Sequence, residues 1–161
     1  MAKTNRHKSI KREDSIAQDF NGRRISMSGG SWSNPGDASS SEYLFEDKFT
    51  DKEFYSLSES TLQKIEKQAR FKRRIPIFRF GFPQSGHEYV IVRDFYIAFD
   101  TESPVKVVSE KKSVRLRDDF LSQVLDQTPH ITLNFVDKNE LYVIIRYDLF
   151  KRDHDKIILK V

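Results

Sequence analysis

The sequence predicts an α/β protein in which helices flank a mixed β-sheet. In the first half of the chain, segments with apolar residues at helical spacing alternate with short segments rich in aromatic and β-branched residues. In the second half, turn residues separate short strand-like segments, which predicts extra strands toward the C-terminus. The chain has 161 residues, enough for one domain with a substantial core but too few for two large domains.

Composition narrows the functional classes. The net charge of +4 is mildly basic, which permits a nucleic-acid partner without requiring one. The chain contains no cysteine, which excludes disulfides, cysteine-ligated zinc and thiol chemistry. Its apolar runs are too short to span a membrane, and no apolar segment follows the basic N-terminus as in a secretory signal. We therefore expect a cytoplasmic protein.

The N-terminal region combines positive charge with a predicted helix. Residues 1–8 form a basic arm that we expect to be flexible, either as a solvated tail or as an arm that contacts phosphates. Residues 8–21 have helical spacing, and Gly22 is expected to end the helix. Glu13 falls inside the apolar stripe of this helix. Because a buried carboxylate is costly unless it is compensated, Glu13 either reaches the edge of the stripe or points toward a cation, a metal or a metal-bound water. The helix alone favours the edge, but Glu46 and Asp37 together favour a shared site.

A loop rich in serine and glycine follows this helix. Residues 23–27 predict a short strand, and residues 28–36 consist almost entirely of Ser, Gly, Asn and Pro. Such a loop can bring backbone N–H groups close to a phosphate. It is not a Walker loop, because no Gly-Lys-Ser or Gly-Lys-Thr sequence follows it.

Residues 43–50 predict the strand that carries the candidate chemistry. Because strand side chains alternate between faces, Glu46 and Lys48 project from the same face, roughly 7 Å apart along the strand. An acid and an amine side by side can hold a divalent cation and a phosphate together, and Asp37 can supply a second carboxylate. Oxygen ligands of this kind suit Mg²⁺ or Mn²⁺. An acid-x-lysine pair is also common on a solvated strand face, so the pair alone does not decide between these roles.

A second helix and a third strand complete the first half. After a polar link at residues 51–55, the sequence Ser56-Leu57-Ser58-Glu59 matches a capping box and predicts a helix to about residue 71. Gln68 lies on the inner face of this helix or at its edge. A basic cluster ends the helix, and residues 75–82 predict the next strand.

The second half predicts short elements and no catalytic set. The expected elements are a strand or hairpin within residues 87–100, short strands at 105–109 and 113–116, a helix at 118–126, a hairpin of strands 131–136 and 141–147 with its turn at 137–139, and a last strand at 156–161. His87, His130 and His154 are far apart in the sequence, so surface or structural roles are expected for them.

The order of these motifs resembles the PD-(D/E)xK nuclease superfamily, and within it the archaeal-type Holliday junction resolvases and their phage-encoded relatives. The matching residues span roughly the first half of the chain: Glu13, Ser28-Gly29, Gly36-Asp37, Glu46-Asp47-Lys48, Gln68-Ala69 and Arg74-Ile75-Pro76. The resemblance implies a restriction-endonuclease-like core at residues 9–83 and a β-rich extension at residues 84–161, both within one domain.

One residue departs from the pattern of the superfamily. The position between the acid and the lysine is usually apolar because it faces the core, but here it is Asp47. Either that face of the strand is partly open, or a cation such as Arg79 lies beside Asp47.

The resemblance implies Mg²⁺-dependent hydrolysis of DNA phosphodiesters, with Mn²⁺ as a possible substitute. Asp37 and Glu46 would bind the metal, and Lys48 would orient the attacking water or stabilise charge in the transition state. Glu13 would act through a water or a second metal, Gln68 would fix the geometry of the strand, and Ser28 would lie near the phosphate.

The resemblance also implies a homodimer that cuts four-way DNA junctions in a bacterial or phage-infected cell. The cations expected to contact DNA are Lys8, Lys11, Arg12, Arg23, Arg24, Arg70, Arg73, Arg74, Lys112 and Arg115. Two alternatives remain open: another nuclease of the same superfamily, acting in restriction, repair or transposase-type end cutting, and a DNA-binding protein without catalytic activity.

Overall fold

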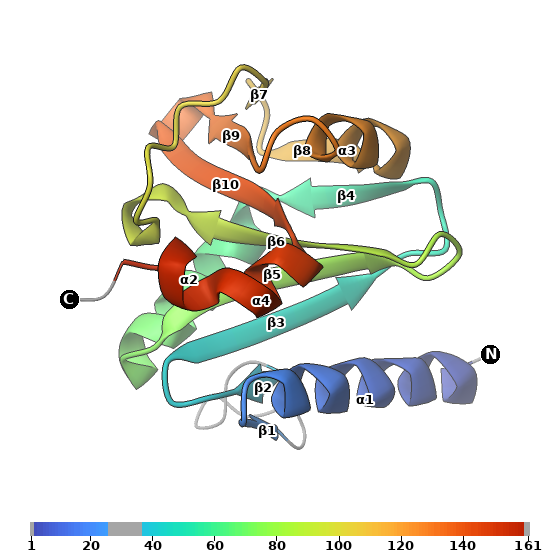
Figure 1. The fold of residues 1–161 in the computed structure, drawn as a ribbon. Helices are drawn as coiled ribbons and strands as arrows, with labels where there is room; N and C mark the ends of the chain where they lie inside the picture. Colours follow the sequence, from blue (N-terminus) through green and yellow to red (C-terminus); the bar gives the residue numbers. More distant parts are fainter. Residues whose placement is uncertain (1, 26–36, 160–161) are drawn as a thin grey trace.

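A computed structural model describes residues 2–25 and 37–159 of the chain (Figure 1). The helices are α1 (Ala2–Asp19), α2 (Glu59–Lys72), α3 (Asp118–Leu125) and α4 (Tyr147–Ile157). The strands are β1 (Arg23–Arg24), β2 (Ala38–Ser39), β3 (Tyr43–Phe49), β4 (Phe54–Ser58), β5 (Ile75–Phe82), β6 (His87–Arg93), β7 (Lys106–Ser109), β8 (Ser113–Arg117), β9 (Ile131–Phe135) and β10 (Glu140–Arg146). The α/β class is therefore confirmed.

Most strands form one mixed sheet. Its eight strands follow the order β1-β2-β3-β5-β6-β10-β9-β7, and β4 pairs with β8 in a separate two-stranded sheet. The β3–β5 and β7–β9 pairs are parallel, and the other pairs of the large sheet are antiparallel. Two parallel neighbours need a crossover connection, and β4 and α2 supply it between β3 and β5.

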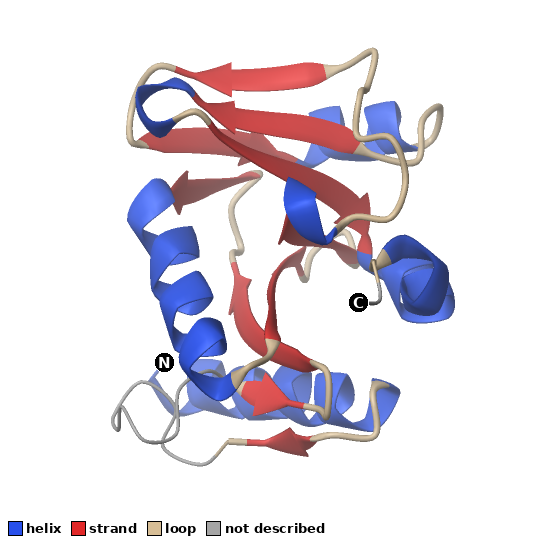
Figure 2. Ribbon diagram, turned by 90° about the vertical axis from the view of Figure 1, so that its left-hand side faces the viewer, coloured by secondary structure: helices blue, strands red, loops and turns tan. Residues whose placement is uncertain are grey.

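Helices cover both faces of the large sheet, as the turned view in Figure 2 shows. On one face, Phe20 of α1 and Phe150 of α4 pack with Phe45 and Ile77 of the sheet. The opposite face packs against residues of α2, α3, β4 and β8. The alternating side chains of β3 therefore point into different environments, with Phe45 toward α1 and Leu44 toward the apolar side of α2.

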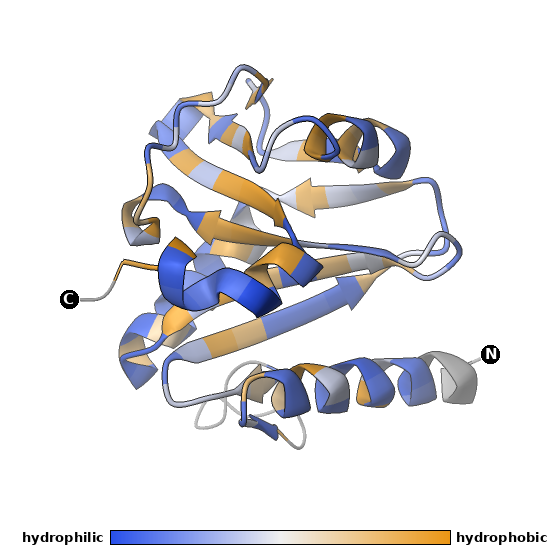
Figure 3. Cartoon of the chain, in the orientation of Figure 1, coloured by the Kyte–Doolittle hydropathy of each residue, from blue (hydrophilic) through white to orange (hydrophobic). Residues whose placement is uncertain are grey.

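The hydropathy of β3 changes along its length (Figure 3). Its first residues, Tyr43 to Phe45, are buried, whereas Glu46 to Phe49 are polar or partly exposed. The apolar half anchors the strand between the two helical layers, and the polar half extends to the edge of the core. Side chains that act on a ligand need a rigid element of this kind.

The N-terminal segment differs from the prediction. Residues 2–8, expected to be a flexible arm, belong to α1, which begins at Ala2. The left-handed residue after this helix is Asn21, with φ of 53°, rather than Gly22. Gly22 is needed for another reason, because a Cβ at this position would lie 2.0 Å from the carbonyl oxygen of Ser39.

Three further elements differ from the prediction. The polar link and capping box contain strand β4, and Ser58 rather than Ser56 caps α2, where its hydroxyl oxygen accepts a hydrogen bond from the Thr61 backbone N–H. The predicted last strand at 156–161 is reduced to an isolated bridge between Ile158 and Ile97, because the chain is helical in α4 up to Ile157; residues 160–161 lie outside the described part. The short strand β2 was not predicted.

No helix in the described part of the chain has the length and apolar character needed to cross a membrane.

Candidate functional site

The site begins at the first residue of β2, where the pairing of β2 with β3 stops. The pairing of β2 with β3 stops at Phe45, whose carbonyl accepts a hydrogen bond of 2.8 Å from the Asp37 backbone N–H. The next edge donor, the Asp47 backbone N–H, donates to Oδ2 of Asp37 at 2.7 Å. Asp37 is 8 % exposed. Its carboxylate therefore continues the hydrogen bonding of the sheet edge and is held beside the polar half of β3.

Glu46 and Lys48 project from the opposite face to Asp47, as the alternation predicts. The Lys48 ammonium lies 3.4 Å from Oε1 of Glu46. The side chain of Glu46 is mostly buried, and that of Lys48 is 48 % exposed. Lys48 can therefore keep its contact with Glu46 while its ammonium reaches a bound ligand.

Four of the predicted site residues line one hollow. Its volume is about 320 Å³, and it is lined by Ser9, Glu13, Asp37, Glu46, Asp47, Lys48, Phe49 and Lys64. Glu13 comes from α1, Asp37 from the segment before β2, and Glu46 and Lys48 from β3. Residues separated by up to 35 positions in the sequence thus meet in a polar concavity.

Burial and a neighbouring negative charge raise the pKa values of Glu13 and Glu46. Burial, together with the charge of Asp37, raises the pKa of Glu13 to about 7. Burial and Asp37 also raise the pKa of Glu46, and the neighbouring Lys48 opposes that shift. A bound cation would relieve both effects, because it favours the ionised form of each carboxyl group.

A second, smaller hollow adjoins the first on the α2 side. It has a volume of about 120 Å³ and is lined by Glu46, Lys48, Thr61, Lys64, Ile65 and Gln68. Gln68 therefore lies beside the acid–lysine pair, where the prediction placed it. Lys64 lines both hollows. The prediction did not name Lys64, although its spacing of four residues from Gln68 puts both on one face of a helix.

Two arginines compensate the charge of Asp47, the acidic residue at a position that is usually apolar in the superfamily. The Asp47 side chain is 2 % exposed, and its Oδ1 lies 3.2 Å from Nε of Arg79, the cation that the sequence suggested. Arg12 of α1 donates to both carboxylate oxygens of Asp47, at 2.7 and 2.9 Å. Glu88 of β6 pairs with both arginines. In the nucleases that this sequence resembles, the side chain at this position is usually apolar. Here it is a buried carboxylate that is paired with two arginines.

This network attaches α1 to the sheet beneath the site. Arg12 donates to the carbonyl of Lys48 at 3.4 Å, and its guanidinium lies so close to β5 that a Cβ at Gly81 would meet it at 2.7 Å. Arg79 stacks over the ring of Tyr147, with 4.4 Å from its guanidinium carbon to the ring centroid. Because Arg12 directly precedes Glu13, the ion pair with Asp47 also sets where Glu13 enters the hollow.

Of the cations predicted to contact DNA, some are exposed to solvent and others are paired with groups of the protein. Arg12 donates hydrogen bonds to Asp47, so its guanidinium is already paired, and its role as a DNA contact stays a prediction. Arg24 pairs with Asp14 at 3.0 Å, and Arg74 donates to the Ser40 carbonyl at 2.8 Å. The exposed cations are Lys8, Lys11, Arg23, Arg70, Arg73, Lys112 and Arg115. Ser28 and its loop lie outside the described residues.

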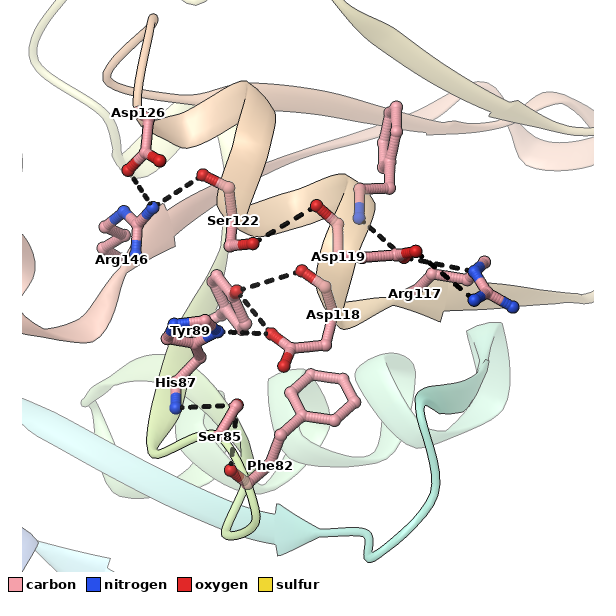
Figure 4. Close-up of polar contacts among 11 residues, drawn as sticks. Phe82, Ser85, His87, Tyr89, Arg117, Asp118, Asp119, Ser122, Asp126 and Arg146 are labelled. Carbon is pink, nitrogen blue, oxygen red and sulfur yellow. Dashed lines mark hydrogen bonds and ion pairs between the residues drawn. The ribbon is translucent and has the colours of Figure 1, made fainter.

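The structure contains another polar hollow, of about 420 Å³, near the β5–β6 turn and the start of α3. Figure 4 shows its central contacts: Oδ1 of Asp118 lies 2.9 Å from Nδ1 of His87 and accepts a hydrogen bond of 2.8 Å from the Tyr89 hydroxyl. His87 pairs with Asp118 here, and Arg117 pairs with Asp119 and Glu53. None of the predicted catalytic residues lines this hollow.

No protein-family model and no curated protein sequence matches the chain.

Proposed function

We propose that this protein is a Mg²⁺-dependent DNA endonuclease of the PD-(D/E)xK type, with a restriction-endonuclease-like core. The observation that carries the proposal is the shared hollow of Glu13, Asp37, Glu46 and Lys48. These are the residues that the order of sequence motifs singled out, and they come from three separate segments. A solvated acid-x-lysine pair would not require Glu13 and Asp37 to lie beside it.

The crossover from β3 through α2 to β5 supports the same proposal. β3 carries the acid–lysine pair, α2 crosses over, and β5 returns parallel to β3 with Glu46 opposite Phe78. This strand–helix–strand unit positions Gln68 against the pair, as the resemblance implies.

The donor set fits Mg²⁺ as a cation shared with the substrate. Among the described residues, no three His, Cys, Asp or Glu side chains are arranged to hold a metal ion by themselves. Mg²⁺ is commonly bound by one or two carboxylates, with waters and substrate phosphates completing its shell. Asp37 and Glu46 would supply these two carboxylates. A bound Mg²⁺ would polarise the phosphate and make a coordinated water a stronger nucleophile.

The remaining residues have roles that follow from their positions. Lys48, held beside Glu46, would stabilise negative charge as it develops on the reacting phosphate. Glu13, which lines the hollow beside Asp37, would act through a water or a second metal. Gln68 would hold the α2 side of the acid–lysine pair, and Asp47 would act beneath the site, as an anchor for β3 and α1.

We propose branched DNA, and four-way junctions in particular, as the substrate. Such an enzyme would act as a homodimer, because a two-fold assembly places two sites on opposed strands of a two-fold junction. Recognition would depend on phosphate position and branch shape rather than on base edges.

The proposal is tested by cleavage of labelled four-way junction, flap and linear duplex DNA in Mg²⁺, with Asp37→Asn as the matched inactive variant. Paired nicks on the junction, absent in the variant, are the expected result. Preferential cutting of duplex or ends would keep the metal site and overturn the choice of substrate. Binding without cutting in Mg²⁺ or Mn²⁺ would contradict the proposed activity and leave a DNA-binding protein.

A further inference from the structure

Lys64 is the one residue that borders both hollows yet was not expected at the site. It is an exposed residue of α2 and lies where the large hollow meets the smaller one. Its positive charge acts on Glu46, since it lowers the pKa of that carboxyl group. Lys64 is therefore close enough to the acid–lysine pair to affect whatever binds there.

Lys64 differs from the other cations near the site because they form ion pairs. Arg12 and Arg79 are committed to Asp47, and Lys48 is paired with Glu46. None of the ion pairs within the described part of the chain involves Lys64. Since Glu13, Asp37 and Glu46 would repel a DNA strand, a further cation beside them, whose charge no ion pair offsets, favours the binding of a phosphate there.

The surroundings of Lys64 also suit a phosphate. Thr61 and Gln68 line the same small hollow from α2, at positions one turn before and one turn after Lys64. A hydroxyl and an amide can each donate a hydrogen bond to a phosphate oxygen, and a lysine ammonium supplies the charge.

We propose that Lys64, with Thr61 and Gln68, binds a DNA phosphate next to the one that is cut. The inference rests on the proposed function, and it gives Lys48 and Lys64 different roles. Lys48 acts on the reacting phosphate, whereas Lys64 holds the strand in place before and during the reaction. Loss of Lys64 should therefore weaken DNA binding and raise KM, with little change in kcat.

The test compares wild type with Lys64→Gln and with Lys106→Gln, a matched change at an exposed lysine of the far edge strand β7. The Kd for junction DNA is measured across a range of salt concentrations without divalent cations, and kcat and KM are measured separately in Mg²⁺. Lys64→Gln is expected to weaken the Kd several-fold and to reduce the slope of log K against log salt by about 0.9, the value for one lost phosphate contact. Lys106→Gln should match wild type.

Each result has a distinct meaning. A Kd and salt slope for Lys64→Gln equal to those of Lys106→Gln would overturn the phosphate site, even if wild type cuts DNA. A loss of kcat with an unchanged Kd would also overturn it, because Lys64 would then act in the chemical step. If wild type binds but does not cut, the nuclease proposal fails, while a reduced slope would still support a phosphate site at Lys64. If wild type does not bind DNA, both fail.

Discussion

At the scale of single residues, Asp47 links the chemistry of the site to the stability of the fold. Its backbone N–H holds Asp37 in place, and its side chain holds Arg12 and Arg79. Burial raises the pKa of Asp47, and the two guanidinium groups oppose that shift. The cost of burying the Asp47 carboxylate is compensated only while both arginines are present.

Replacement of Asp47 with asparagine should therefore be severely destabilising. The change leaves two largely buried arginines with less negative charge, so a loss of about 3–5 kcal/mol in the free energy of unfolding is expected. Urea denaturation measures it, with Asp51→Asn at an exposed position after β3 as the control, expected within about 0.5 kcal/mol of wild type. Equal stabilities for the two variants would show that the network does not stabilise the fold.

The raised pKa of Glu13 predicts how stability depends on pH. The folded-state pKa of about 7 lies above the ordinary glutamate pKa of 4.5, so the folded protein binds the proton more tightly than the unfolded chain. The contribution of Glu13 is then most favourable below about pH 4.5 and is lost as the pH rises to about 7. The groups that act on Glu13 are Asp37, Arg24, Asp47 and Asp14.

Unfolding measured from pH 4 to 8 without divalent cations, on wild type and Glu13→Gln, checks this prediction. Wild type should lose stability relative to the variant between about pH 4.5 and 7, and the difference should be constant above that range. Parallel curves throughout would mean that Glu13 has an ordinary pKa.

At this scale, some contacts could be predicted from the sequence and others could not. Strand alternation placed Glu46 and Lys48 on one face, and the unusual acid between them pointed to Arg79 as its partner. Arg12 was assigned to DNA because a basic N-terminus resembles a phosphate-binding arm. In the structure Arg12 pairs with Asp47, which is 35 residues away in the sequence, and only the packing of α1 against β3 brings the two together.

At the scale of elements, the connection from β3 to α2 decides how the site is built. β4 continues to Ser58, and the Ser58 hydroxyl group then caps α2, the helix that carries Lys64 and Gln68. Correct capping fixes where the helix begins and therefore which side chains face β3.

Ser58→Ala should lower the free energy of unfolding by about 1 kcal/mol, because the Thr61 N–H at the start of α2 would lose its acceptor. Ser56→Ala is the informative control, since Ser56 was the cap expected from the sequence but is exposed in β4. Chemical denaturation of both variants distinguishes the two serines. A larger loss for Ser56→Ala would place the cap where the capping-box pattern did and would contradict the structure.

The elements that were missed have identifiable causes. The Ser-Leu-Ser-Glu pattern fits a capping box, so it concealed a strand that pairs with β8, a segment more than 50 residues later. In α4, the buried Tyr147, Phe150 and Ile157 do follow helical spacing, so the signal was present. The strand β2 has only two residues and depends on β3 for its pairing, so no local pattern identifies it.

At the scale of the whole molecule, the two halves of the chain form one sheet. β6, from the half without predicted chemistry, pairs with β5, and β10 pairs with the other edge of β6, so both strands lie in the middle of the sheet. Glu88 of β6 pairs with both arginines of the Asp47 network. The second half therefore supports the site from beneath, and the site depends on the complete sheet rather than on the first half alone.

The central claim is that the shared hollow catalyses metal-dependent hydrolysis. Single-turnover cleavage of a labelled four-way junction, measured with saturating protein in Mg²⁺, tests it most directly on wild type, Glu46→Gln, Lys48→Gln and the control Glu42→Gln. Glu42 is an exposed carboxylate at the start of β3, so its variant should cut like wild type. The account predicts that Lys48→Gln cuts about 10²- to 10³-fold more slowly and that Glu46→Gln loses activity at least as severely. Undiminished cutting by both would contradict the account and move the chemistry elsewhere on the protein.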